Sequence, residues 1–328
     1  MRKRIDYYYS ESRKLVADKA TNFLLFITLF LVHLQGITQI LNNKTGEAFT
    51  DRPFFNAQVI KQNKIQTISG KFTVKKVNDI LRTTDLERKY YFDPEGRIIK
   101  TYETIQAEKG RDTIVTYWEY DELGNVSVIR TADQYGFYAT HYSYDSLKRV
   151  VREEFRRNLN QNKSSIGFEL GDEFVVSYET SRYETFPGQE KRIVYNSYDQ
   201  PYKEEISYFD EDGFLIEKMD RLKRTSGIKK TNYFYNEKGL LDSLLITSNQ
   251  TGSSSRLFTY KYDNFGNLLS QQYYKNGLHT TEFQVIYHRE TTLLNYILTR
   301  EISTNYITIL SLDNYTFFNK GEVILMKE

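Results

Sequence analysis

The chain of 328 residues contains no cysteine, four prolines and four histidines, and its 45 basic and 43 acidic side chains leave a net charge of +2. Without cysteine there is no disulfide scaffold, no thiolate metal site and no cysteine nucleophile. A nearly neutral chain lacks the basic excess with which nucleic-acid-binding proteins neutralise phosphates, so we predict no nucleic-acid partner. The sequence also has no P-loop, no Gly-x-Gly-x-x-Gly and no Gly-x-Ser-x-Gly. We therefore expect no cofactor and no enzymatic activity.

One long apolar run, residues 23–34, stands near the N-terminus and follows six basic residues. Basic residues, an apolar stretch of about a dozen residues and then small polar residues form the plan of a secretory signal, and the run is shorter than a spanning helix. We predict that residues 1–38 are a signal peptide, with an uncleaved N-terminal membrane anchor and a buried core helix as alternatives. The first two place the rest of the chain in the periplasm, at the cell surface or in the medium. Contact with a membrane is then expected only through an uncleaved leader.

Aromatic residues are abundant, with 28 Tyr, 21 Phe and one Trp, and many belong to a recurring motif. The motif is an aromatic residue, Asp or Asn, two variable residues, Gly, one further residue and an aliphatic one. Five copies are complete, and in two others Lys148 or Asp199 stands in place of Gly. The aromatic positions are Phe92, Tyr120, Tyr144, Tyr195, Phe209, Tyr235 and Tyr262.

The motif predicts a β-hairpin turn. Asp or Asn at the first turn position hydrogen-bonds the backbone beyond it, and Gly accepts the left-handed conformation that closes the loop. Each period of roughly 26 residues then holds two strands, one tight turn and one looser turn. The predicted turn residues are Asp93, Gly96, Asp121, Gly124, Asp145, Asp210, Gly213, Asn236, Gly239, Asp263 and Gly266.

The repeat predicts an all-β fold, a solenoid-like elongated antiparallel meander in which each hairpin contacts only its neighbours. We expect YD-like hairpin repeats over residues 85–280, since this range holds all copies of the motif. Residues 39–84 and 281–328 are expected to be N-terminal and C-terminal capping strands, because the ends of a repeat sheet otherwise expose open edges.

The repeated aromatic-Asp-x-x-Gly core over about residues 92–278 resembles the YD repeat of the RHS and teneurin family. The resemblance implies a β-sheet solenoid or shell on a protein that is exported or held at the cell surface. The long repeat runs of that family and the core signature that precedes a toxin are missing here. The chain is therefore similar to a short secreted bacterial relative, and toxin encapsulation is not carried over.

Candidate sites are few. Residues 210–213 could offer oxygen ligands to Ca²⁺, but the further carboxylates of a calcium loop are missing and a hairpin turn explains them. His279 and His288 lack a neighbouring ligand pattern, so no metal site is predicted. A basic segment precedes an aromatic strand and could bind an anionic glycan or lipid surface, with a solvated loop as the alternative. Its residues are Arg221, Lys223, Arg224, Lys229 and Lys230.

Three functions follow from these observations. The first is a non-enzymatic exported β-repeat protein of the bacterial cell envelope or exterior that acts as a binding or structural scaffold for a glycan or an envelope or surface protein. The second is a carbohydrate-processing enzyme that uses sheet carboxylates such as those of Glu153-Glu154 or Glu204-Glu205. The third is an immunity or antitoxin-like hairpin-repeat protein, which requires that the leader is not removed.

Overall fold

The computed structural model describes residues 55–108, 110–133, 136–160, 169–250, 252–318 and 320–325. The described residues all belong to one compact unit. The predicted signal peptide or anchor at 1–38 lies outside the described residues. Across the described part of the chain, no helix is long and apolar enough to cross a membrane.

In the described part of the chain, the short helix α2 (Ala57–Gln62) precedes the strands. The first strands along the chain are β1 (Ile65–Lys75), β2 (Arg82–Phe92), β3 (Ile98–Ala107), β4 (Gly110–Tyr120), β5 (Val126–Asp133) and β6 (Gly136–Tyr144). The next are β7 (Val150–Asn160), β8 (Leu170–Phe186), β9 (Gln189–Tyr195), β10 (Pro201–Phe209), β11 (Leu215–Leu222) and β12 (Ile228–Tyr235). The last are β13 (Leu241–Ser248), β14 (Ser254–Tyr262), β15 (Leu268–Lys275), β16 (Leu278–Tyr287), β17 (Leu294–Glu301), β18 (Ile307–Phe317) and β19 (Lys320–Leu325).

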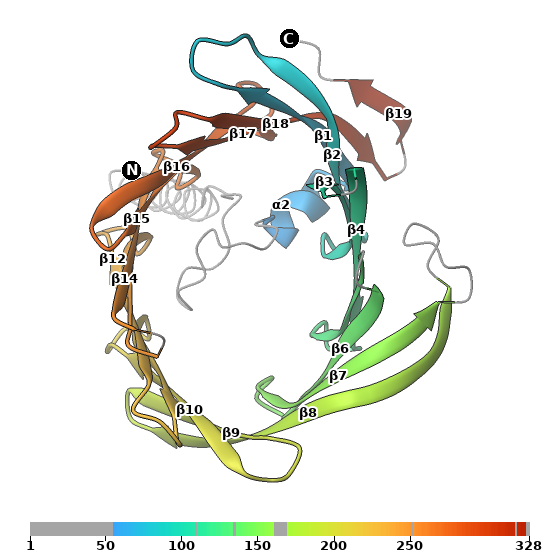
Figure 1. Ribbon diagram of the computed structural model, residues 1–328. Coiled ribbons are helices and arrows are strands. Elements are labelled where there is room, and N and C mark those ends of the chain that lie inside the picture. The colour runs from blue at the N-terminus through green and yellow to red at the C-terminus, as the bar shows by residue number, and fades with distance from the viewer. Residues whose placement is uncertain are drawn as a thin grey trace, which may run out of the picture. The chain divides into compact units, whose positions relative to one another are not determined.

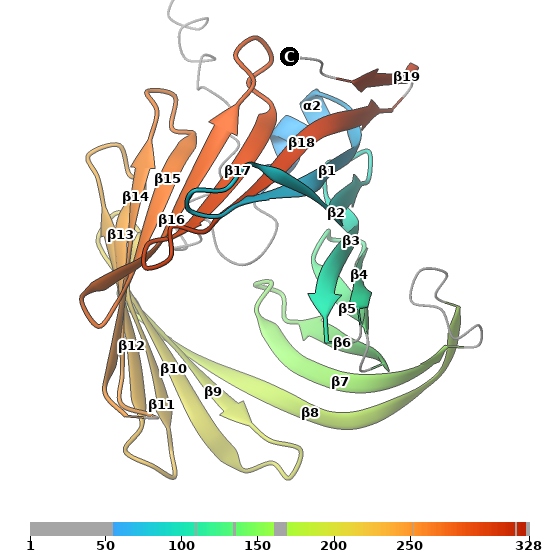
Figure 2. The same ribbon diagram turned by 45° about the horizontal axis from the view of Figure 1, so that its top comes forward.

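The strands form one antiparallel sheet that closes on itself. Each strand pairs with the next along the chain, and β1 pairs with both β2 and β18. The closing register runs from Ile65 opposite Phe317 to Lys75 opposite Ile307, and the Thr67 and Thr316 hydroxyls lie 2.6 Å apart across it. Strands β1 to β18 therefore make a closed barrel, seen as a ring in Figure 1 and from a tilted direction in Figure 2.

The predicted open meander is wrong, although the all-β class is confirmed. The resemblance to the YD repeats of the RHS and teneurin family, with the solenoid that it implied, is overturned by the same closure. The ranges 39–84 and 281–328, expected to cap two open edges, instead supply β1 and β18, which pair with each other. Joining the two edges satisfies their backbone N–H and C=O groups, which caps would have had to cover.

The motif turns share one hydrogen-bond pattern. In the first, the Asp93 carboxylate accepts the backbone N–H of Arg97 at 2.8 Å, and Gly96 has a φ of +83°. The two copies without Gly form the same loop, since Lys148 and Asp199 adopt φ values of +61° and +54°. The corresponding side-chain acceptors at the other turns are Asp121, Asp145, Asn196, Asp210, Asn236 and Asp263.

Most of the motif turns lie at one rim of the barrel. Six of the seven follow an even-numbered strand and so lie at the same end, whereas the Asn196 turn follows β9 and lies at the opposite end. The sequence step between Tyr195 and Phe209 is short because the turns that follow these two residues lie at opposite ends of a single strand, β10.

Tyrosines connect successive hairpins along the rim that carries the six turns. Tyr120, just before its turn, donates from its hydroxyl to the carbonyl of Ile98, just after the preceding turn, at 2.6 Å. The contact recurs from strand to strand, and we call its donors the tyrosine ladder. They are Tyr120, Tyr144, Tyr183, Tyr235, Tyr262, Tyr287 and Tyr315. Burial raises the pKa of Tyr120 and of Tyr235 to about 12, so the hydroxyls remain protonated donors at neutral pH.

Helix α2 lies on the inner side of the ring beside β1 to β3 (Figure 1). The ring of Phe55, just before the helix, packs edge-on against Tyr90 and Phe92 of β2, with centroids 4.7 and 5.1 Å apart. A Cβ atom on Gly96 would lie 2.0 Å from the carbonyl oxygen of Ala57. The glycine of the first motif turn is therefore required for its positive φ and also for close approach of the helix.

Candidate binding cavity in the barrel lumen

A cavity of about 800 Å³ lies inside the barrel and is lined by residues of β1 to β4 and β11 to β18. The volume falls in the range of roughly 300–1,000 Å³ that is usual for small-molecule sites. Because side chains alternate across a strand, the lining residues identify the inner face of each of these strands. Trp118 of β4, the one tryptophan of the chain, is among them.

The lining is apolar over a large part of its surface, which we call the apolar wall. Leu244 and Leu310 on it are buried, and Phe258 stacks on Tyr273 with centroids 4.8 Å apart. The wall continues into a cluster of buried hydrophobic residues, which includes Leu241, Leu268 and Tyr315. The apolar wall consists of Phe72, Leu244, Ile246, Phe258, Ile297 and Leu310, from β1, β13, β14, β17 and β18.

Across the ring from β1, β17 and β18 lie β9 and β10 (Figure 1). Charged side chains of these two strands form ion pairs on the inner face. We call Glu153, Arg192, Lys203, Glu205 and Lys218 the charged wall. Glu205 pairs with Arg192 at 3.5 Å, with Lys218 at 3.5 Å and with Lys203. Burial alone would raise the pKa of Glu205, but these cations outweigh it and lower the pKa to about 2. The carboxylate is therefore ionised at all ordinary pH values.

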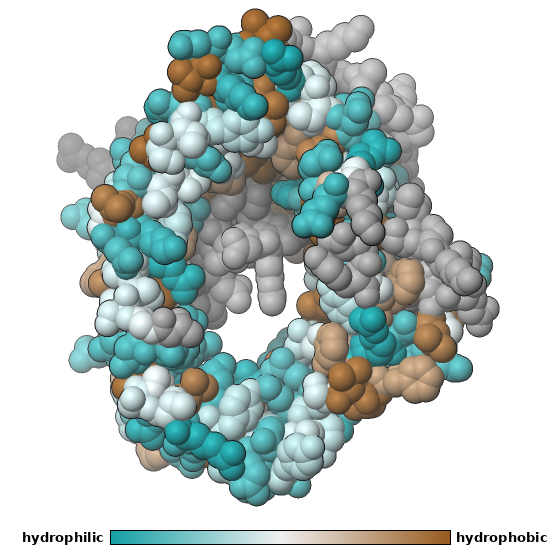
Figure 3. Space-filling view, viewed as in Figure 1, coloured by the Kyte–Doolittle hydropathy of each residue, from teal (hydrophilic) through white to brown (hydrophobic). Residues whose placement is uncertain are grey.

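The outer face of the barrel is also rich in ion pairs. Glu204, the chain neighbour of Glu205, points to the opposite face and contacts Lys191, Arg221 and Lys223. Figure 3 views the ring end-on, and hydrophilic residues cover much of the coloured surface there, with apolar groups among them, one of which lies over β7 and β8. Among the exposed apolar side chains of these strands, Val175 lies opposite Arg156 and faces outward, whereas Phe155 and Phe174 lie on the same inner face as Glu153.

A second, partly buried carboxylate lies at the centre of an ion-pair cluster on the outer face of β5 to β8. Glu173 pairs with Arg130 and, at 3.0 Å, with Arg156, and it accepts a 2.7 Å hydrogen bond from Asn158. Burial opposes ionisation, yet the two arginines lower the pKa of Glu173 to about 2. His141 lies 3.2 Å from the same carboxylate, but burial and Arg156 lower its pKa. The contacts of Glu173 therefore connect β5, β6, β7 and β8 on the outer face.

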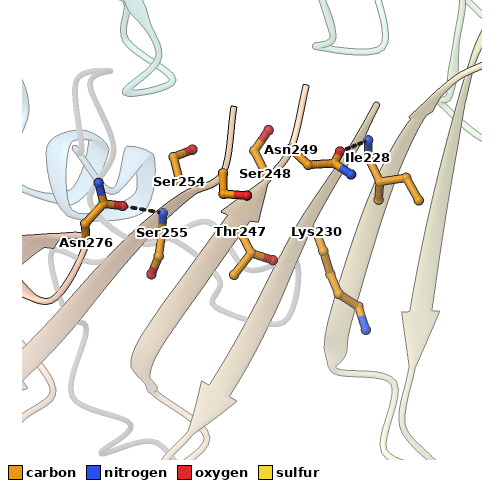
Figure 4. Close-up of a pocket in the computed structure, with 9 residues that line it drawn as sticks. Ile228, Lys230, Thr247, Ser248, Asn249, Ser254, Ser255 and Asn276 are labelled. Carbon is orange, nitrogen blue, oxygen red and sulfur yellow. Dashed lines mark hydrogen bonds between the residues drawn. The ribbon is translucent and has the colours of Figure 1, made fainter. Parts of the chain in front are cut away.

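The inner face of β14 changes from polar to apolar along its length. Ser254 lies near the mouth, Arg256 follows two residues later, and Phe258 and Tyr260 continue into the cavity. Figure 4 shows the rim beside Ser254, where a pocket of about 580 Å³ is lined by Ile228 and Lys230 together with serine, threonine and asparagine residues. There the Asn276 side-chain oxygen accepts the Ser255 N–H at 2.8 Å (Figure 4). Along the inner face of β14, a serine near the rim is therefore followed by Arg256 and then by two aromatic side chains.

The structure does not gather the predicted basic segment into one cationic surface. Lys229 faces the cavity and pairs with Asp220 at 3.1 Å, whereas Lys230 faces outward and pairs with Glu217 at 2.7 Å. Arg221 and Lys223 both contact Glu204 on the outer face. The remaining residue, Arg224, is exposed in the loop between β11 and β12.

The predicted turn residues lie at the rim, where the side-chain oxygens of the aspartates and of Asn236 accept backbone N–H groups. Asp210, the strongest calcium candidate in the sequence, accepts the N–H groups of Asp212 and Phe214 at 3.0 and 2.8 Å. Among the described residues, no group of three or more His, Asp or Glu is placed to hold a metal ion. His279 stacks on Tyr274 with ring centroids 4.7 Å apart.

Sequence reasoning missed the cavity residues, above all Arg256 and Trp118. The alternation Ser254, Arg256, Phe258, Tyr260 along one strand face was visible in the sequence. This alternation did not indicate a binding site as long as an open sheet was expected, because neither face of an open sheet encloses a lumen.

Comparison of the sequence with known protein families and with curated proteins finds no match. Among solved structures the chain is similar to a porin-like protein from Bacteroides uniformis, with 11% identity, a TM-score of 0.36 and coverage of 77% of this chain and 97% of that one. A porin-like protein from Bacteroides vulgatus gives 12% identity and a TM-score of 0.32, covering 76% and 98%. The Tc holotoxin pore of Photorhabdus luminescens gives 14% identity and a TM-score of 0.27, covering 72% and 15%. The barrel described above rests on the strand pairing of this chain itself.

Proposed function

We propose that this chain is a non-enzymatic binding protein of the bacterial cell envelope or exterior that holds a small apolar or amphipathic ligand in the lumen of its barrel. The observation that carries the proposal is the cavity of about 800 Å³, whose lining combines the apolar wall with a few charged groups. Concave, mostly apolar sites with a small number of placed polar groups are the usual form of ligand pockets.

Two further observations support the setting. The N-terminal order of basic, apolar and small polar residues is that of an export signal. Outward-facing ion pairs such as Lys230–Glu217 and Lys191–Glu204 suit a barrel surrounded by water, since a lipid-facing barrel presents an apolar band. We therefore place the barrel in an aqueous compartment outside the cytoplasm, and the binding surface inside the lumen rather than on the outer basic segment.

A neutral apolar dye tests the proposal directly. N-phenylnaphthylamine fluoresces strongly in apolar surroundings, and we expect saturable enhancement on titration into the full-length protein. Ile246→Glu places a carboxylate on the apolar wall and is expected to weaken dye binding about tenfold or more. Leu245→Glu, the next residue of β13, faces outward and serves as the matched control with unchanged binding. Equal binding by both variants, or no saturable binding to the parent protein, would show that the lumen is not the site.

A further inference from the structure

We infer that the ligand of the lumen is an anionic amphiphile, with one acidic head group held by Arg256 and one aliphatic chain lying along the apolar wall. The inference rests on the proposed function, because it specifies the chemistry of the molecule that the cavity takes. It depends on three properties of the lining: an uncompensated cation, the position of that cation, and the surroundings of the other charged groups.

Arg256 differs from the other cations that line the cavity. Lys229 pairs with Asp220 at 3.1 Å, and Lys218 lies 3.5 Å from Glu205. Arg88 pairs with Glu103. For Arg256, in contrast, the described residues provide no carboxylate within 4.0 Å, although it lines the same cavity and is only partly exposed. Among the described residues, the lining thus contains one guanidinium, that of Arg256, without a carboxylate beside it.

An unbalanced guanidinium beside apolar side chains is a costly arrangement unless an anion joins it. A charge that loses water without gaining a partner is unfavourable, and the planar guanidinium matches a carboxylate or phosphate through two parallel hydrogen bonds. An acidic head group would supply that partner. A neutral lipid would leave Arg256 as it is, and a polyanion would meet the carboxylates of Glu103 and Asp220 in the same cavity.

The position of Arg256 gives the ligand a direction. On β14, Ser254 lies one inner-face step toward the mouth, and Phe258 lies one step toward the interior, each step spanning about 7 Å. On the neighbouring strand β13, Ile246 lies opposite Arg256 and Leu244 lies opposite Phe258. A head group at Arg256 therefore leaves its chain against Phe258 and Leu244, where an aliphatic chain loses contact with water.

Trp118 allows the inference to be tested on the full-length chain, because bromine quenches indole fluorescence on contact and this single tryptophan lines the cavity. The two probes are ω-bromoundecanoic acid and ω-bromoundecanol, which differ only in the head group. We expect both to quench Trp118 and the acid to bind about tenfold or more tightly, as a hydrogen bond to a charged group implies.

Variants of β14 separate the head-group contact from general effects on the barrel. Arg256→Gln is expected to remove the preference for the acid and leave the affinity for the alcohol unchanged, while Arg256→Lys keeps the charge and most of the preference. Lys261→Gln removes a positive charge from the outer face of the same strand and should behave like the parent. If acid and alcohol bind equally and Arg256→Gln changes neither, the head-group inference is wrong while lumen binding stands. If neither probe quenches Trp118 and N-phenylnaphthylamine also fails to bind, lumen binding itself is wrong.

Discussion

The two walls of the lumen are built from the same kind of strand but held together by different forces. The apolar wall continues into a buried cluster in which Leu268 and Leu310 are 2% exposed, so its stability comes from removing apolar surface from water. The charged wall is held by Glu205 and the three cations around it. A hydrophobic contact does not respond to protonation, whereas an ion pair does. The difference predicts that one side of the barrel resists acid and the other does not.

The largest effect is expected from truncation beneath the apolar wall. Leu268→Ala should lower the free energy of unfolding by about 2–5 kcal/mol, because it opens a cavity in a packed cluster. Leu269→Ala, one residue further along β15, is the matched control, since Leu269 is 41% exposed and its truncation should cost less than about 1 kcal/mol. Urea denaturation measures both. Equal losses would mean that the cluster is not packed as described.

Acid is expected to act on the charged wall. The pKa of Glu205 is lowered to about 2 from its ordinary value of 4.5, so its contribution to stability is complete above about pH 4.5 and is lost as the pH falls toward 2. The loss should reach up to roughly 3 kcal/mol for this one group. Denaturation between pH 6 and pH 2.5 measures it.

Two variants locate that pH dependence. Glu205→Gln should flatten the dependence of stability on pH in this window, because the titrating carboxylate is gone. Leu268→Ala should shift the whole curve downward without changing its slope, because Leu268 lies in an apolar cluster. An unchanged slope in Glu205→Gln would place the acid-sensitive groups elsewhere.

Alanine substitutions at the glycines of two motif turns test the contact between helix α2 and the barrel, because only one of the two turns touches the helix. Gly96 and Gly213 have nearly the same φ, +83° and +81°, so alanine causes similar backbone strain at both. At Gly96 the new Cβ would also lie 2.0 Å from the Ala57 carbonyl oxygen, whereas at Gly213 nothing lies within 4 Å. Gly96→Ala should therefore destabilise the protein by about 2 kcal/mol more than Gly213→Ala in thermal or chemical denaturation. A difference near zero would show that α2 does not depend on this contact.

The smallest effect is expected in the tyrosine ladder, which crosses both walls. Tyr262→Phe leaves the Leu241 carbonyl without its hydroxyl donor and should cost about 1 kcal/mol. Tyr183→Phe should lower the free energy of unfolding by less. The Arg149 guanidinium lies 4.4 Å from the ring centroid and can still contact a phenylalanine ring, and Arg192 remains near the position of the lost hydroxyl. Denaturation of the two single variants and the double variant measures the difference. A larger loss at Tyr183 would reverse the comparison.

The local part of the fold could be predicted from the sequence because it is determined by neighbours along the chain. Asp93 and Gly96 specify a turn through one side-chain hydrogen bond and one positive φ, and both are encoded within five residues. Closure could not be predicted in this way. The pairing of Thr67 with Thr316 joins segments from opposite ends of the chain, and either strand would pair equally well with any similar edge.

The candidate site was missed for the same reason. Arg256 and Phe258 could be assigned to one face of a strand, but only closure makes that face the lining of a lumen. The predicted basic segment shows the converse error. Lys229 and Lys230 are adjacent in sequence, yet a strand sends them to opposite sides of the barrel wall, where each meets its own carboxylate.

Pairing of the first strand with the last sets the order in which the barrel can be completed. A ribosome releases β1 long before residues 307–317 exist, so one edge of β1 has no partner until almost the whole chain has been made. During that interval the growing sheet presents a free edge that can pair with another copy, and long loops must close before the final contacts form. In the native barrel both edges of β1 are paired, whereas in the nascent chain one edge is not. The folding yield should therefore depend on how quickly β18 is synthesised and pairs with β1.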